Sequence, residues 1–189
     1  MTDLFALLGE SPRPWLDLDQ LKAKYHGLTA REHPDAAGAT ADFAEINRAF
    51  QVLSGPATRL RHLLDLESHV ALSRAQPVPG DITPFFTPVA GATQSFDAFL
   101  KKHAAASSPL ARALLSTEQC RLQERIEQTL ASLQQKQDAV LAQLREADAL
   151  WQTDRPAALA ALPALWQSLG YTTKWIATLR EALFRRASL

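Results

Sequence analysis

LDLDQLKAKYHGLTAREHPDAAGATADFAEINRAFQVLSG, residues 16–55, predicts two helices joined by a short loop. In both halves the apolar residues recur at steps of three, four and three, which places them on one stripe of each helix. The first stripe is Leu18, Leu21, Tyr25 and Leu28, and the second is Phe43, Ile46, Phe50 and Leu53. Two such helices are expected to pack antiparallel and to bury the two stripes against each other.

The ends of these helices are also predicted by local chemistry. Asp17 has the side chain of an N-cap, and Gln20 follows at the spacing of a capping box. Because the residue before a proline is driven out of the α region, Pro34 should end the first helix near His33. Gly55 should end the second helix, and Pro56 suits the first turn of another helix.

His33, Pro34 and Asp35 are therefore predicted to lie in the loop at the exposed tip of a helical hairpin. Side chains that can recognise a partner and have no place in the core are common on such loops. A metal site or a catalytic site is disfavoured, because no second ligand or nucleophile follows at a useful spacing.

Composition excludes several classes of function. Lys plus Arg equals Asp plus Glu at 20 each, so no basic excess points to a nucleic-acid partner. Cys120 is the only cysteine, which excludes an intramolecular disulfide and a thiolate zinc site and is typical of a reducing cytoplasm. The first residues have neither the basic start of a secretory signal nor the bias of a transit peptide, and no apolar run has the length of a membrane span. We therefore expect a cytoplasmic protein without a cofactor or a membrane partner.

Residues 71–93 are predicted to be a linker. The stretch QPVPGDITPFFTPVAGAT, residues 76–93, holds four prolines and two glycines. Its Phe85 and Phe86 are expected to pin the segment to a domain, and a docking peptide for a partner is the alternative interpretation. A short helix is expected over residues 95–105.

A long helix and a final helix follow, and with the short one they predict an antiparallel three-helix bundle over residues 94–189. Ser116 and Gln119 form a capping-box pattern at the expected start of the long helix. Its apolar seam alternates steps of four and three, and the final helix is expected to start near Pro156. The seam is Leu122, Ile126, Leu130, Leu133, Val140, Leu144, Ala147 and Trp151.

Residues 1–70 resemble a J-domain, and the fold implied for the chain is all-α, with this hairpin followed by the bundle. The similarity rests on DLFALLG, on the helix that leads into the His-Pro-Asp triplet, and on INRAFQVL at the expected distance beyond it. SGPATRLRHLLDL is most similar to the HscB-type co-chaperones of iron–sulfur cluster assembly. The resemblance implies a protein that stimulates the ATPase of a DnaK/HscA-class chaperone, is not itself an enzyme, and delivers a client.

The same resemblance implies which residues would bind the chaperone. The carboxylate of Asp35 can form a charge-assisted pair with an arginine, and the basic side chains of the preceding helix can steer docking. The family often has a basic pair directly after the tyrosine, whereas this sequence has His26-Gly27. The implied contact residues are Lys22, Lys24, Tyr25, His26, Arg31, His33, Pro34 and Asp35.

In the bundle, EQCRLQERIE, residues 118–127, resembles the family's scaffold-binding helix. This similarity makes Cys120, Arg121, Leu122 and Glu124 candidate contacts for an iron–sulfur scaffold protein. The family has a leucine and a methionine where this sequence has Ser116 and Thr117. A second interpretation is that Cys120, Leu122 and Ile126 are simply core residues.

Two other functions stay open at this point. The chain could be a J-domain co-chaperone with a different client, or a non-catalytic helical adaptor whose J-like hairpin is structural. An enzyme is disfavoured, since no nucleophile, base and orienting residue form a recognisable set.

Overall fold

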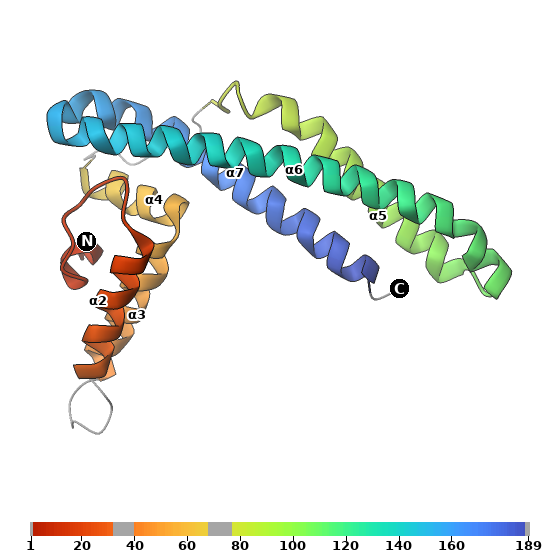
Figure 1. The fold of residues 1–189 in the computed structure, drawn as a ribbon, viewed down its shortest axis with the longest axis horizontal. Helices are drawn as coiled ribbons and strands as arrows, with labels where there is room; N and C mark the ends of the chain where they lie inside the picture. The colour runs from red at the N-terminus through yellow and green to blue at the C-terminus, as the bar shows by residue number, and fades with distance from the viewer. Residues whose placement is uncertain (1, 32–39, 68–76, 188–189) are drawn as a thin grey trace. The chain divides into compact units, whose positions relative to one another are not determined.

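The computed structural model of the chain describes residues 2–31, 40–67 and 77–187 (Figure 1). Within these ranges the ordered elements are helices and no strand occurs, which confirms the all-α prediction. The elements are α1 (Leu4–Leu7), α2 (Leu18–Arg31), α3 (Thr40–Ser54), α4 (Pro56–Glu67), the 3₁₀ turn η1 (Thr83–Phe85), α5 (Phe86–Ala105), α6 (Pro109–Thr153) and α7 (Arg155–Ala187).

The chain forms two compact units. The described residues of Met1–Pro77 pack with Leu141–Gln167, and Val78–Val140 packs with the described residues of Ser168–Leu189. The end of α6 and the start of α7 therefore belong with the N-terminal helices. This division is not visible in the sequence, where a single bundle over residues 94–189 was expected.

The N-terminal helices begin and end where local chemistry predicts. Asp17 caps α2, since its Oδ1 accepts hydrogen bonds from the backbone N–H groups of Asp19 and Gln20 at 2.9 and 3.0 Å. Gly9 follows α1 with a φ of 62°, a conformation that glycine adopts without steric cost. Gly55 separates α3 from α4, and Pro56 occupies the first position of α4, as predicted.

Helices α2 and α3 form the predicted hairpin (Figure 1). Leu21, Ile46 and Leu53 are buried in it and confirmed as core, whereas Tyr25, Leu28 and Phe50 of the same stripes are half-buried. Leu18 and Phe43 are 42% and 39% exposed, so the stripes are not buried at their first residues.

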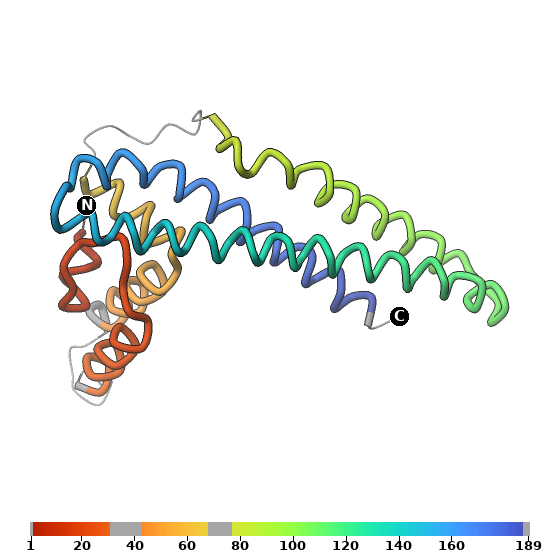
Figure 2. The backbone as a smooth tube through the Cα atoms, turned by 45° about the horizontal axis from the view of Figure 1, so that its top comes forward, coloured from red at the N-terminus to blue at the C-terminus, as the bar shows by residue number. Residues whose placement is uncertain are grey.

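Helices α5, α6 and α7 form the predicted antiparallel bundle (Figures 1 and 2). Side-chain contacts fix the directions, because residue numbers rise along α6 while those of its partners fall. Glu118 pairs with Lys102 of α5, and Lys136 pairs with Asp81 just before it. Gln123 accepts from Arg186 of α7, and Gln137 donates to Thr173. The core of this unit includes Phe96, Phe99, Leu122, Ile126, Leu133, Ile176 and Leu179.

Helix α5 begins earlier than the sequence pattern indicated. It starts at Phe86 instead of residue 95, so the second half of the proline-rich stretch is helical. A proline is tolerated in the first turn of a helix because its missing N–H would have no partner there, and Pro88 lies in that turn. The Phe86 ring contacts Tyr171 and Trp175 with centroids 5.5 and 4.9 Å apart, which favours the pinning interpretation over a docking peptide.

Helix α6 also begins earlier than predicted, at Pro109. The cap is Ser108, whose Oγ accepts the Ala111 N–H at 3.1 Å, and Pro109 takes the first helical position. The predicted cap at Ser116 is wrong, because its hydroxyl donates to the Ala113 carbonyl inside the helix. The seam of α6 is confirmed, with Leu130 only half-buried.

Candidate functional site

Contacts of one side chain, Tyr25, connect the two helices of the hairpin, α2 and α3. The Tyr25 hydroxyl donates to Asn47 Oδ1 at 2.5 Å, and the Tyr25 ring stacks on Phe50 with centroids 4.4 Å apart. Tyr25 is therefore half-buried between α2 and α3 and helps to hold the chain ends that lead into the loop. His33, Pro34 and Asp35 lie outside the described residues.

The candidate basic side chains of α2 differ in whether they already bind a partner within the protein. Lys24 Nζ donates to the Gly9 carbonyl at 2.9 Å and pairs with Glu10 at 2.8 Å, so it anchors the segment after α1. Lys22 is exposed and lies 3.7 Å from the fully solvated Asp19 carboxylate. The side chain of Arg31 lies outside the described residues.

His26 lies on the surface of α2 beside Tyr25. It is exposed on α2, with its ring centroid 5.3 Å from that of Tyr25. Among the predicted chaperone-binding residues that the structure describes, Lys22 and His26 are exposed and have no buried partner. The face available for steering is smaller than the sequence suggested, because Lys24 has a structural role there.

A partly buried ionic contact within the N-terminal unit was not predicted from the sequence. Asp148 on α6 accepts hydrogen bonds from Arg13 Nε at 3.0 Å, from Arg13 Nη2, and from the Trp15 backbone N–H at 3.0 Å. The indole N–H of Trp151 donates to the Pro12 carbonyl at 3.0 Å. Together these contacts fix the segment between α1 and α2 against α6.

Arg59 lies beside this contact and is buried. Its Nε donates to the Pro14 carbonyl at 2.9 Å and its Nη1 to the Leu53 carbonyl at 2.8 Å. Burial lowers the pKa of Arg59 to about 10, and the negative charge of Asp148 opposes this shift. A buried guanidinium with two carbonyl partners and a nearby carboxylate is a structural feature, which the sequence alone does not reveal.

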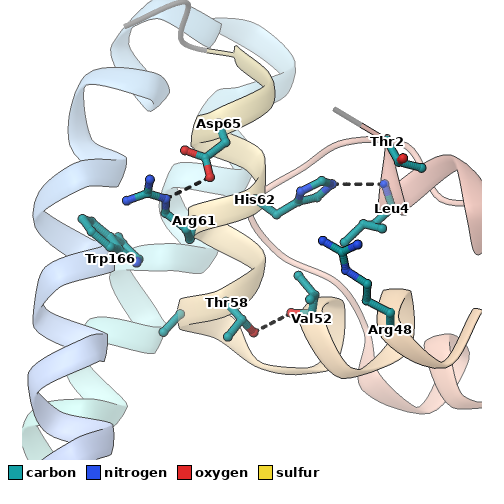
Figure 3. Close-up of a pocket in the computed structure, with 10 residues that line it drawn as sticks. Thr2, Leu4, Arg48, Val52, Thr58, Arg61, His62, Asp65 and Trp166 are labelled. Carbon is teal, nitrogen blue, oxygen red and sulfur yellow. Dashed lines mark hydrogen bonds and ion pairs between the residues drawn. The ribbon is translucent and has the colours of Figure 1, made fainter. Parts of the chain in front are cut away.

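A cavity of about 660 Å³ opens between α1, α3, α4 and α7, and Figure 3 shows the side chains around it. His62 points toward the start of α1, where its Nε2 accepts the Leu4 N–H at 3.1 Å. Arg61 lies 5.3 Å above the Trp166 ring and pairs with Asp65 at 2.9 Å. Burial lowers the pKa of His62, in keeping with a neutral imidazole that accepts a hydrogen bond.

The candidate client residues of α6 divide into two groups. Cys120, Arg121 and Glu124 are exposed, so the core interpretation of Cys120 is wrong. Leu122 is only 6% exposed and belongs to the bundle core with Ile126, so its side chain is not available as a contact. Ser116 and Thr117 are exposed and offer a partner little apolar surface.

Two large apolar side chains lie exposed one to two turns before these residues. Leu110 and Leu114 are 71% and 74% exposed on the first turns of α6. The sequence-based prediction missed them because it placed the start of the helix at Ser116. The signal was present, since Ser108-Pro109 is a favourable helix start that puts both leucines on the same face.

The described residues contain neither a cluster of metal ligands nor a helix long and apolar enough to cross a bilayer. Within residues 2–31, 40–67 and 77–187, no group of three or more His, Cys, Asp or Glu side chains could hold a metal ion. In the same ranges, no helix has the length and apolar character needed to cross a bilayer.

Sequence comparison relates part of the chain to DnaJ chaperones. A segment of 63 residues, 32% of this chain, is 43% identical to the chaperone protein DnaJ of Synechococcus sp. and to that of Nostoc punctiforme. The match covers 16% of either DnaJ, so this chain spans only a small part of their length. No protein-family model matches the chain.

Structure comparison covers nearly the whole chain. The chaperone HscB from Vibrio cholerae superposes with a TM-score of 0.60 at 16% identity, over 98% of this chain and 99% of that one. The chain has the HscB fold. The human co-chaperone protein HscB gives a TM-score of 0.54, again at 16% identity, over all of this chain and 84% of that one. The resemblance to HscB-type J-domain proteins found in the sequence is thus confirmed at the level of the fold.

Proposed function

We propose that this chain is a J-type co-chaperone that stimulates the ATPase of a DnaK/HscA-class chaperone and delivers a client to it. The observation that carries the proposal is the combination of two independent similarities. A 63-residue segment is 43% identical to DnaJ, and the fold of nearly the whole chain is that of HscB. A purely structural adaptor would require neither the His-Pro-Asp triplet nor its place between two packed helices.

The hairpin supports this function through its stiffness. The Tyr25–Asn47 hydrogen bond and the Tyr25–Phe50 stack hold α2 against α3, so the residues between the helices start from fixed ends. Fixed ends lower the conformational entropy that a loop loses when it binds. Asp35 would then pair with an arginine of the chaperone, His33 would supply a hydrogen bond, and Lys22 with Arg31 would steer the approach.

The client that we propose is an iron–sulfur cluster scaffold protein, bound by the bundle of α5, α6 and α7. The HscB fold over 98% of the chain supports this assignment. A different client is the second candidate, favoured by the exposed Ser116 and Thr117 and by the burial of Leu122. In both cases the protein would act by binding and carry out no chemistry of its own.

The test of the co-chaperone function is ATP hydrolysis by the DnaK/HscA-class chaperone of the same organism, measured with and without this protein. The wild type should stimulate hydrolysis, and His33→Gln and Asp35→Asn should abolish the stimulation without lowering the melting temperature. Asp19→Asn is the matched control, because it removes a fully solvated carboxylate from α2. If Asp35→Asn stimulated as well as the wild type, the co-chaperone function would be refuted.

A further inference from the structure

The cavity of Figure 3 has hydrogen-bond donors that the proposed function does not use. Its volume of about 660 Å³ is in the range of small-molecule binding sites. All of its lining residues belong to one compact unit of the chain, so the cavity is formed within that unit. Ligand sites combine apolar walls with a few placed polar groups, and this lining does the same. The apolar lining residues are Leu4, Val52, Ala57 and Trp166.

His62 brings one of these donors to the cavity. The residue is only 7% exposed, and its Nε2 accepts the Leu4 N–H at 3.1 Å. A neutral imidazole that accepts at one nitrogen carries its proton on the other, so Nδ1 of His62 is a donor. Among residues 2–31, 40–67 and 77–187, no acceptor is hydrogen-bonded to this nitrogen. Because a donor in a buried side chain costs free energy until it is paired, the N–H of Nδ1 favours a ligand with an acceptor oxygen.

Arg48 brings a positive charge to the same cavity. It is exposed on α3, and no carboxylate of the described part of the chain lies at ion-pair distance from it. Figure 3 shows its guanidinium extending from α3 toward the His62 ring, and its charge favours the neutral form of that imidazole. A guanidinium beside an N–H donor is an arrangement that binds the two oxygens of a carboxylate.

The other charges of the lining balance each other. Arg61 pairs with Asp65 at 2.9 Å, which leaves the charge of Arg48 without a counterpart in the lining. Asp3 also acts on His62, but it does not line the cavity, and its carboxylate caps α1. A single uncompensated positive charge suits a monoanion, whereas a phosphate dianion would also be repelled by Asp65. The charges therefore select a carboxylate over a phosphate.

We propose that this cavity binds a small organic monocarboxylate, whose oxygens accept hydrogen bonds from Arg48 and from Nδ1 of His62. The apolar body of the ligand lies against Leu4, Val52 and Ala57. The inference goes beyond the proposed co-chaperone function and does not depend on it. A ligand held in this way connects α3 and α4 beside the start of α1, so it stabilises the N-terminal unit whenever it is bound.

The experiment titrates phenylacetate into the full-length ¹⁵N-labelled chain at constant ionic strength, followed by NMR. Phenylacetate should bind saturably with a dissociation constant of about 1 mM or lower, the scale expected for a ligand of this size. Its binding should shift the Leu4 amide and the Nδ1 resonance of His62, because the two groups share one imidazole. Phenylacetamide and phenethylamine have the same ring without the negative charge, so they should bind at least about tenfold more weakly. Equal affinity for all three compounds would overturn the carboxylate site.

The decisive variant is Arg48→Gln, because this side chain is exposed and its loss should leave the fold and the melting temperature unchanged. It removes a charge-assisted hydrogen bond and should weaken phenylacetate binding about tenfold or more. Arg180→Gln makes the same change at an exposed position of α7 outside the cavity and should bind like the wild type. Two results would overturn the proposal: the absence of a saturable shift at Leu4, and a phenylacetate affinity that Arg48→Gln leaves unchanged.

Discussion

Asp148 offers the sharpest test of how the N-terminal segment is held. It is 6% exposed and accepts three hydrogen bonds, two from Arg13 and one from the Trp15 backbone. Asp148→Ala removes all three and leaves the Trp15 N–H without its partner. It also removes the negative charge that balances the buried Arg59 guanidinium, whose pKa burial lowers to about 10.

The expected loss of stability follows from the exposure of the partners. Breaking a buried charge pair by deleting one side chain costs about 3–5 kcal/mol. Because the Arg13 side chain is 39% exposed and can be solvated again, we expect the lower end, about 3 kcal/mol. For a chain of this length that corresponds to a melting temperature lower by about 6–12 °C. Asp148→Asn keeps an acceptor for Trp15 and should cost about half as much.

The assay is thermal unfolding followed by circular dichroism, with Asp138→Ala as the matched control. Asp138 lies exposed on the same helix, so its loss should leave the melting temperature within about 1–2 °C of the wild type. An equal shift for Asp148→Ala and Asp138→Ala would show that the carboxylate does not hold residues 13–15. In a double-mutant cycle of Asp148→Ala with Arg13→Gln we expect a coupling energy of about 1–2 kcal/mol. No coupling in this cycle would contradict the predicted ion pair.

Two further predictions concern the N-terminal helices. Because burial lowers the pKa of His62 below its unfolded value, the unfolded chain binds more protons in mildly acidic solution. The stability that neutral His62 contributes should therefore be fully present above pH 6.5 and be lost as the pH falls toward the pKa of His62 in the folded protein. Thermal melting curves from pH 7.5 to 5 should show this loss. The melting temperature of His62→Gln should depend less on pH than that of the control His26→Gln. Gly9→Ala should lower the free energy of unfolding by about 1 kcal/mol, because φ at Gly9 is 62°. Gly27→Ala inside α2 should raise the free energy of unfolding by up to about 1 kcal/mol, because no atom lies near the added methyl group. Urea unfolding in which both variants change the free energy in the same direction would contradict this reasoning.

Local patterns predicted most of the helices because helix formation is decided largely by neighbours in sequence. The cap at Asp17, the break at Gly55 and the seam of α6 each depend on residues within a few positions. The errors in the starts of α5 and α6 have a common cause, which is the treatment of proline. Pro88 was counted toward a linker and Pro109 was not recognised as a helix start, yet both lie in the first turn of a helix, where the missing N–H of proline would have no helical partner.

Contacts between distant segments were beyond this kind of prediction. Arg13 and Asp148 are 135 residues apart, and nothing in the pattern around either residue pairs them. The same holds for the bond between Trp151 and the Pro12 carbonyl. These contacts explain why residues 141–167 pack with the N-terminal helices, although the sequence suggests one continuous bundle.

The two candidate surfaces differ in how a sequence encodes them. The chaperone-binding residues were predicted from a short contiguous motif and from residues beside the apolar stripe of α2, and that stripe itself marks the buried side of the helix. The client-binding residues were predicted on a long helix, where half a turn separates core from surface. Leu122 is core, whereas Cys120 two residues earlier is exposed, and the run chosen from resemblance mixes both faces. Once the core side of α6 is known, helical spacing places Leu110, Leu114, Arg121 and Arg125 together on an exposed side of the helix. A client surface on a bundle is therefore better predicted from the side that the core leaves open than from a contiguous run of residues.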